Sequence, residues 1–95
     1  MKLVYTMVES GVLPDVREVM EEQGITGWTR FSDVQGAGER NVHEGTPVYP
    51  GLNEVLLLVL DEEQVQPFVD RCHEVRDSFP LKPGMRFIVT DCQFI

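Results

Sequence analysis

The chain has 95 residues, of which 42% are apolar, 16 are acidic and 8 are basic, so its formal charge at pH 7 is -8. This length allows one domain and excludes two domains joined by a linker, and the apolar fraction excludes a disordered chain. The acidity argues against a nucleic-acid partner, because phosphate binding depends on Lys and Arg. A domain this small buries little more than about 60% of its unfolded surface, so oligomerisation is expected to stabilise it.

The cysteines and the N-terminal residues predict a cytoplasmic setting. Cys72 and Cys92 form neither a C-x-x-C motif nor a disulfide scaffold. Residues 1–8 lack the apolar segment and cleavage site of a signal peptide. The longest apolar run, residues 55–60, is far shorter than the roughly 20 residues that span a bilayer.

The first segment of the chain predicts a strand followed by a helix. Residues 1–8 are rich in Val, Tyr and Thr, which favours a strand. Residues 13–23 predict a helix, since Pro14 suits a first turn, where its missing N–H has no partner to lose. Gly24 suits the C-terminal cap of that helix. Apolar residues at helical spacing predict one buried stripe, formed by Val12, Val16, Val19 and Met20.

A second strand is predicted over residues 27–34, with Trp28 and Phe31 on opposite faces. One of these aromatic rings is expected to pack under a helix and the other against a neighbouring subunit; a role in stacking on a nucleobase is the alternative. From residue 35 to residue 51 no helical or strand period persists, and Gly and Pro are frequent. A loop of about fifteen residues in a compact domain is usually functional or disordered.

Residues 53–60 (NEVLLLVL) predict a central strand, because they are apolar on both faces near the end. Asp61-x-x-Gln64 resembles a capping box that opens a second helix. Pro67 leaves two alternatives open: a helix from Asp61 that is kinked at Pro67, or a regular helix that begins near Gln66. The apolar stripe predicted for this helix consists of Val65, Phe68, Val69, Cys72 and Val75 or Arg76.

The last segment predicts a turn over residues 78–84, with two prolines, and a strand over residues 85–95. The predicted order is β-α-β-β-α-β, typical of the α+β ferredoxin-like arrangement of four antiparallel strands with two helices on one face. Residues 1–95 therefore form one predicted domain. The strands are apolar on both sides, so we expect the uncovered face of the sheet to pack against the sheets of other subunits in a small oligomer.

Four stretches of the chain resemble motifs of the PII-like signalling proteins, in the same order and at similar spacing. They are residues 24–29 (GITGWT), 33–38 (DVQGAG), 58–65 (LVLDEEQV) and 83–89 (PGMRFIV). With the order of elements, the resemblance covers most of residues 1–90. It implies a homotrimer that binds effector nucleotides, often ATP or ADP, in clefts between subunits. It also implies a T-loop, here about residues 36–51, that changes shape with the ligand and docks on a partner such as an enzyme or a transporter.

The residues that would hold a triphosphate depart from the family pattern. Glu39-Arg40 replaces an Arg-Gln pair, and Asn53 and Met85 each stand where a Lys is expected. A triphosphate needs several fixed positive charges or backbone donors. The local candidates are Arg40, Lys82 and Arg86. This small set favours a divergent PII-like member with another effector over sensing of ATP and 2-oxoglutarate.

The resemblance implies an effector cleft built from three stretches of the chain. Gly36 and Gly38 would let backbone N–H groups approach an anion, although two glycines also suit a turn or bulge at a strand end. The basic residues also suit solvated positions. The predicted ligand-binding set is Gly36, Gly38, Arg40, Asn53, Lys82, Gly84 and Arg86, and the predicted partner-binding residues are Glu39, Asn41, His43 and Glu44.

Two other interpretations remain open at this stage. The first is a metal-binding trimer similar to CutA proteins, with His43, Glu44 and Cys92 as candidate ligands, although a metal site needs three or four converging ligands. The second is an assembly module without a small ligand. Catalysis is not predicted, because no nucleophile elbow, P-loop or H-E-x-x-H motif is present. The leading hypothesis is a non-enzymatic regulator that binds a small effector and signals through its loop.

Overall fold

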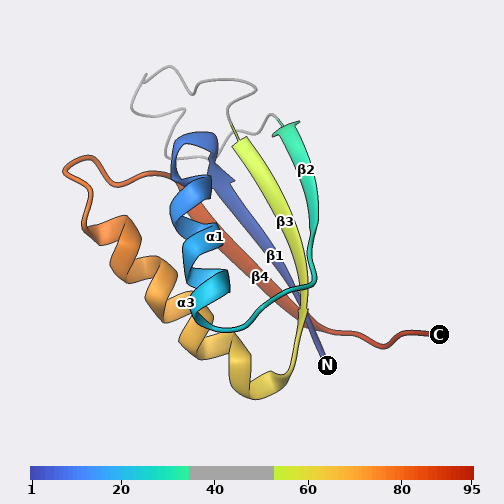
Figure 1. Cartoon of the computed structure of the whole chain (residues 1–95). Helices are drawn as coiled ribbons and strands as arrows, with labels where there is room; N and C mark the ends of the chain where they lie inside the picture. Colours follow the sequence, from blue (N-terminus) through green and yellow to red (C-terminus); the bar gives the residue numbers. More distant parts are fainter. Residues whose placement is uncertain (35–52) are drawn as a thin grey trace.

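A computed structural model describes residues 1–34 and 53–95, and within them it confirms the predicted order of elements (Figure 1). The four strands form one antiparallel sheet in the order β2-β3-β1-β4, and both α-helices cover the same face of it (Figure 1). The predicted loop over residues 35–51 lies outside the described residues. The elements are β1 (Lys2–Glu9), a 3-10 turn η1 (Ser10–Val12), α1 (Leu13–Glu22), β2 (Thr29–Val34), β3 (Asn53–Leu60), α3 (Glu62–Asp77) and β4 (Met85–Asp91).

The core lies between the helices and the sheet, and it follows the alternation of the strands. Every second residue of β1 and β3 points toward the helices and is buried, whereas the residues between them are only partly covered. The predicted apolar stripes of α1 and α3 both face this core, which confirms the prediction made from helical spacing. The buried core consists of Val4, Val8, Val12, Leu13, Val16, Val19, Met20, Ile25, Leu56, Leu58, Leu60, Phe68 and Cys72.

Helix α1 begins and ends as its sequence predicts. Pro14 lies in the first turn, and Gly24 follows the helix with a φ of +69°. In that left-handed conformation the Gly24 N–H donates to the Glu21 carbonyl at 3.1 Å and the Ile25 N–H donates to the Met20 carbonyl at 2.9 Å. This paired closure satisfies two of the last carbonyls of the helix and requires glycine at its centre.

Helix α3 begins at Glu62, so the alternative of a regular helix starting near Gln66 is wrong. The predicted capping box forms at Asp61, whose N–H donates to Gln64 Oε1 at 2.9 Å. The helix then continues through Pro67 to Asp77. Proline removes one N–H donor in the second turn, and this cost is offset by the cap and by the burial of Phe68 in the core.

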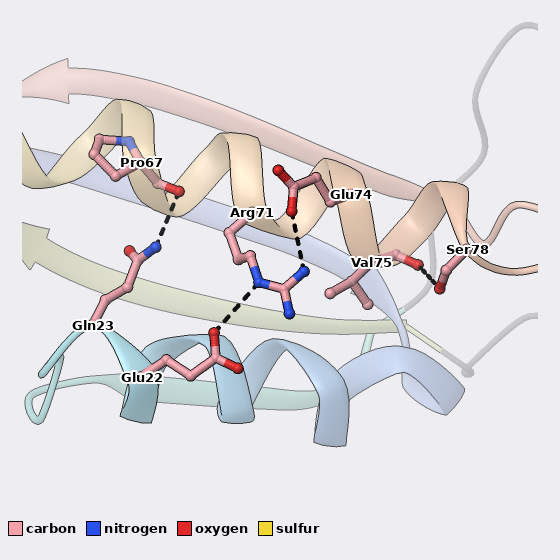
Figure 2. A network of polar contacts seen from close by, with 7 residues as sticks. All are labelled: Glu22, Gln23, Pro67, Arg71, Glu74, Val75 and Ser78. Atoms are coloured by element: carbon pink, nitrogen blue, oxygen red, sulfur yellow. Dashed lines mark hydrogen bonds and ion pairs between the residues drawn. The ribbon is translucent and has the colours of Figure 1, made fainter.

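Polar contacts on the solvent side join α1 to α3 (Figure 2). Gln23 Nε2 donates to the Pro67 carbonyl at 3.1 Å. Arg71 donates to Glu22 at 3.4 Å and to Glu74 at 3.2 Å. These side chains are exposed, so the contacts orient the helices and add little to stability. Neither helix has the length and apolar character of a membrane span within the described residues.

Two strands are shorter than the sequence predicts. β2 begins at Thr29, two residues later than expected, and β4 ends at Asp91, four residues before Ile95. The pairing with β1 extends to Asp91, which lies opposite Lys2, and beyond it the Cys92 N–H donates to the Met1 carbonyl at 3.2 Å.

The face of the sheet opposite the helices is apolar and exposed, and we call it the open face. Tyr5 lies between Leu57 of β3 and Ile88 of β4 in the strand register, and Phe31 lies beside Val55. Tyr5, Phe31 and Ile88 are 36%, 51% and 51% exposed. The open face therefore displays large apolar side chains that the single chain does not cover.

Candidate functional site

The predicted ligand-binding residues fall into two groups. Asn53, Lys82, Gly84 and Arg86 belong to the described part of the chain. The remaining ones lie outside it, as do all the predicted partner-binding residues: Gly36, Gly38, Glu39, Arg40, Asn41, His43 and Glu44. The geometry of the candidate site therefore rests on the first group.

The register of the sheet brings Asn53 and Gly84 to opposite sides of Glu9. Glu9 pairs with Asn53 in β3, and its N–H donates to the Gly84 carbonyl at 3.1 Å. Residues directly opposite each other in an antiparallel sheet share a face. Asn53, Glu9 and Gly84 thus form one row, called here the Glu9 row, at the end of the sheet where β1 and β2 finish and β3 and β4 begin (Figure 1).

The Glu9 side chain covers the backbone of Gly84. A Cβ atom added to Gly84 would lie 3.3 Å from Glu9 Oε1 and 3.5 Å from Glu9 Cγ. The absence of a side chain at Gly84 therefore lets the carboxylate approach the turn closely. Sequence analysis did not single out Glu9, because its place in the Glu9 row follows only from the strand order and register.

Arg86 is a positively charged side chain near the Glu9 row that no described residue neutralises. It lies on the open face opposite Met7, two residues along β4 from Gly84. Among the described residues it has no hydrogen-bond, ion-pair or aromatic partner, whereas every other described Lys and Arg has one. Those partnerships are Lys2–Asp91, Arg17–Trp28, Arg30–Glu54, Arg71 with Glu22 and Glu74, Arg76–Asp77, and Lys82–Asp77.

Lys82 points toward the end of α3. Its Nζ lies 3.5 Å from Asp77 Oδ1, and Asp77 also accepts a hydrogen bond from Arg76 at 3.0 Å. Arg76, together with the weaker attraction of Lys82, lowers the pKa of Asp77. The structure therefore brings Gly84, Arg86 and Asn53 to the same end of the sheet, whereas Lys82 contacts a carboxylate that it shares with Arg76.

An ion pair between a buried carboxylate and an exposed guanidinium lies at the same end of the sheet, on the helix side. Glu54 is 4% exposed, and Arg30 holds it with a fork of two contacts, Nη2 to Oε1 at 2.8 Å and Nε to Oε2 at 3.4 Å. This pair ties β2 to β3 beside Val34 and Asn53. Sequence analysis missed it, although Glu54 occupies a helix-facing position in the alternation of β3, where an acidic residue needs a partner.

A hollow of about 450 Å³ lies at the opposite end of the sheet. Its wall includes Trp28, whose ring lies 4.5 Å from the Arg17 guanidinium carbon, so Trp28 contacts α1 without being buried. The hollow combines an aromatic ring, apolar strand residues and exposed backbone. It is lined by Met1, Gly27, Trp28, Thr29, Leu57, Val59, Leu60, Asp61, Gln64 and Phe94.

The hollow and the Glu9 row are separated by the length of β1. This strand has eight residues, from Lys2 to Glu9, which span roughly 23 Å at the usual rise per residue. One small ligand therefore cannot reach both ends of the sheet on a single chain.

The described residues contain no group of three or more His, Cys, Asp or Glu side chains that converge on a metal position. Cys92 is partly buried at the end of β4, and Cys72 is buried in the core, where burial raises the pKa of its thiol to about 12. The other candidate ligands, His43 and Glu44, lie outside this part of the chain.

Comparison with known proteins supports the architecture and the resemblance. The chain is similar to CPII from Thiomonas intermedia K12 bound to ADP and bicarbonate, with 17% identity, a TM-score of 0.76, and coverage of 98% of this chain and 86% of that one. It is also similar to a PII-like signalling protein from Thermus thermophilus, with 25% identity, a TM-score of 0.66, and coverage of 94% and 83%. No curated protein matches the sequence.

The sequence comparison extends over almost the whole chain. The family described as nitrogen regulatory protein P-II matches residues 1–93, which include every described helix and strand. The chain therefore belongs to the nitrogen regulatory protein P-II family.

Proposed function

We propose that this protein is a non-enzymatic PII-like regulator that binds a small effector, an adenine nucleotide or nucleoside, between the subunits of a trimer. The observation that carries the proposal is the open face, which displays exposed apolar side chains. The hollow lies at one end of the sheet and the Glu9 row at the other, and each offers groups suited to only part of a nucleotide. The whole chain, residues 1–95, acts as one domain in this proposal.

The open face supports assembly. Its exposed apolar side chains lie on β1, β4 and β2 (Tyr5, Ile88 and Phe31). On β3, which lies between β2 and β1, the aliphatic side chains of this face are half-buried. Contiguous apolar surface of this kind usually marks a protein interface. A second and a third copy packed on these faces would cover it and would bring the hollow of one copy toward the Glu9 row of the next.

The two ends of the face complement each other chemically. The hollow offers Trp28, apolar strand residues and the backbone of Gly27, which suit an aromatic base. The Glu9 row offers the Asn53 amide, the Glu9 carboxylate and, one step along the sheet, the Arg86 guanidinium, which suit a ribose or phosphate. Structural relatives of this chain were solved with ADP and bicarbonate and with ADP, AMP and bicarbonate, which supports a nucleotide as the ligand class.

The signal to a partner would pass through residues 36–51. Val34 and Asn53, which flank this segment, are paired between β2 and β3, and Asn53 belongs to the Glu9 row. An effector at the Glu9 row therefore touches the base of the segment. We propose that Gly36, Gly38 and Arg40 complete the ligand site there and that Glu39, Asn41, His43 and Glu44 contact the partner protein.

The effector site can be tested with a matched pair of glycine variants. A Cβ added at Gly27 or at Gly11 meets no atom within 4 Å, so both Gly27→Ala and Gly11→Ala are expected to fold. Gly27 lines the hollow, so the added methyl group of Gly27→Ala should reduce the space for a nucleotide and weaken its binding by roughly tenfold. Gly11→Ala, in η1, should bind like the parent protein.

Calorimetric titration with AMP, ADP and ATP measures these affinities, and the fluorescence of the single tryptophan, Trp28, reports on the hollow directly. Binding that is weakened only in Gly27→Ala would support the site. No heat and no fluorescence change at millimolar nucleotide would contradict the proposed ligand class, whereas equal binding by both variants would place the ligand elsewhere.

A further inference from the structure

Glu9 places a negative charge where the proposed function requires an effector to bind. Its carboxylate has no hydrogen-bond or ion-pair partner among the described residues, and it covers the Gly84 turn with Oε1 3.3 Å from the position of a Gly84 Cβ. Glu9 is exposed, so its carboxylate is free to meet a ligand from solvent or from between subunits.

Two described side chains of opposite charge lie beside this turn on the open face. Arg86 contributes one positive charge, and Glu9, diagonally across from it, contributes one negative charge. The next cation, Lys82, contacts Asp77, a carboxylate that Arg76 also contacts. A polyphosphate bound in the Glu9 row would therefore meet the Arg86 guanidinium and, diagonally across from it, a carboxylate that repels it.

We propose that Glu9 is a specificity-determining residue that makes this end of the site select a nucleoside or nucleoside monophosphate over a nucleoside di- or triphosphate. The inference rests on the proposed function. The carboxylate accepts hydrogen bonds from ribose hydroxyl groups, which are neutral donors. A phosphate oxygen offers no such donor when ionised, and each added phosphate charge within about 4 Å of a carboxylate costs about fivefold in affinity even in water.

The test compares Glu9→Gln with Glu9→Asp and with Glu18→Gln. Glu9→Gln keeps the shape and removes the charge, Glu9→Asp keeps the charge, and Glu18→Gln makes the same neutralising change on the exposed side of α1. Titration calorimetry with adenosine, AMP, ADP and ATP, without divalent cations, gives the affinity of each protein for each ligand.

The parent protein and Glu18→Gln should bind adenosine and AMP more tightly than ADP, and ADP more tightly than ATP. Glu9→Gln should gain at least about fivefold for ATP and less than about twofold for adenosine, and Glu9→Asp should keep the parent order. Raising the salt concentration should narrow the difference between the parent and Glu9→Gln, because screening weakens exposed charges.

Two results would overturn the inference, and they have different meanings. If the parent binds ATP at least as tightly as AMP and Glu9→Gln changes all four affinities equally, Glu9 selects nothing, while the proposed function stands. If neither the parent nor Glu9→Gln binds any of the four ligands, the nucleotide function and the role of Glu9 fail together.

Discussion

The Cys72 thiol and the Glu54 carboxylate are both buried, but the sequence predicts the surroundings of Cys72 more completely than those of Glu54. Cys72 lies on the apolar stripe of α3, so its place in the core follows from helical spacing alone. Glu54 has an equally regular position in β3, but its partner Arg30 lies on another strand. The alternation predicts that residue 54 faces the helices, and only the pairing of β2 with β3 shows what neutralises it.

The Cys72 thiol should be inert while the protein is folded, because burial raises its pKa to about 12. At pH 8 a disulfide reagent should react with one thiol per chain, that of Cys92, and with the second only in denaturant. Cys92→Ser should abolish the reaction of the folded protein. Reaction of folded Cys92→Ser at the rate of an unfolded thiol would contradict the buried position of Cys72.

The same pKa shift predicts a loss of stability in alkali. An unfolded thiol releases its proton near pH 8.5, whereas the folded protein holds it up to a pKa of about 12. Between these values the unfolded state binds fewer protons than the folded state, so the free energy of unfolding decreases as the pH rises. Cys72→Ala should lose part of this dependence in urea unfolding measured from pH 8 to pH 10.5.

At the scale of elements, the sequence predicts all four strands, but it predicts only some of the residues at which they begin and end. Periodicity alone predicts β3 with its bounds, from Asn53 to Leu60. The end of β4 depends instead on its pairing with β1, because its last residue, Asp91, lies opposite Lys2, the first residue of β1. The Glu9 row also depends on how the strands pair, because only the order β2-β3-β1-β4 brings Asn53 and Gly84 to the two sides of Glu9.

The anchoring of β2 can be tested through its ion pair. Arg30→Ala removes both contacts of the fork on the buried Glu54 carboxylate, and it should lower the free energy of unfolding by about 3 kcal/mol. Arg76→Ala removes an exposed pair with Asp77 and should have a much smaller effect. Urea unfolding followed by circular dichroism measures both. Equal effects of the two substitutions would show that the buried pair does not hold β2.

At the scale of the whole molecule, charge and apolar surface lie on opposite sides of the sheet. Ten of the 16 acidic residues belong to α1, α3 and the cap of α3, on the face covered by helices. The open face carries the apolar side chains instead. If the sheets associate as proposed, a molecule divided in this way keeps a strongly acidic outer wall.

Assembly through the open face predicts that a single charge on it changes the mass in solution. The parent protein should have a mass of about 32 kDa, three times the 10.8 kDa of one chain. Ile88→Lys places a charge on the open face at a side chain that is 51% exposed in the single chain, so it should leave the fold intact and reduce the mass. Light scattering after size exclusion measures this directly.

Leu81→Lys is the matched control, since Leu81 is 89% exposed but lies in the turn between α3 and β4, away from the open face. It should leave the mass unchanged. A trimer that survives Ile88→Lys but not Leu81→Lys would place the interface at the turn between α3 and β4, contrary to the proposal.

The pairing of Val34 with Asn53 also bears on how this family diversifies. The two residues are neighbours in the sheet, so the connection between them starts and ends at almost the same point. The entropy of closing such a connection grows only with the logarithm of its length, at about 0.6 kcal/mol per doubling. Insertions and deletions between these two positions therefore cost the fold little, and the length of the connection can change during evolution while the pairing of β2 with β3 stays as it is.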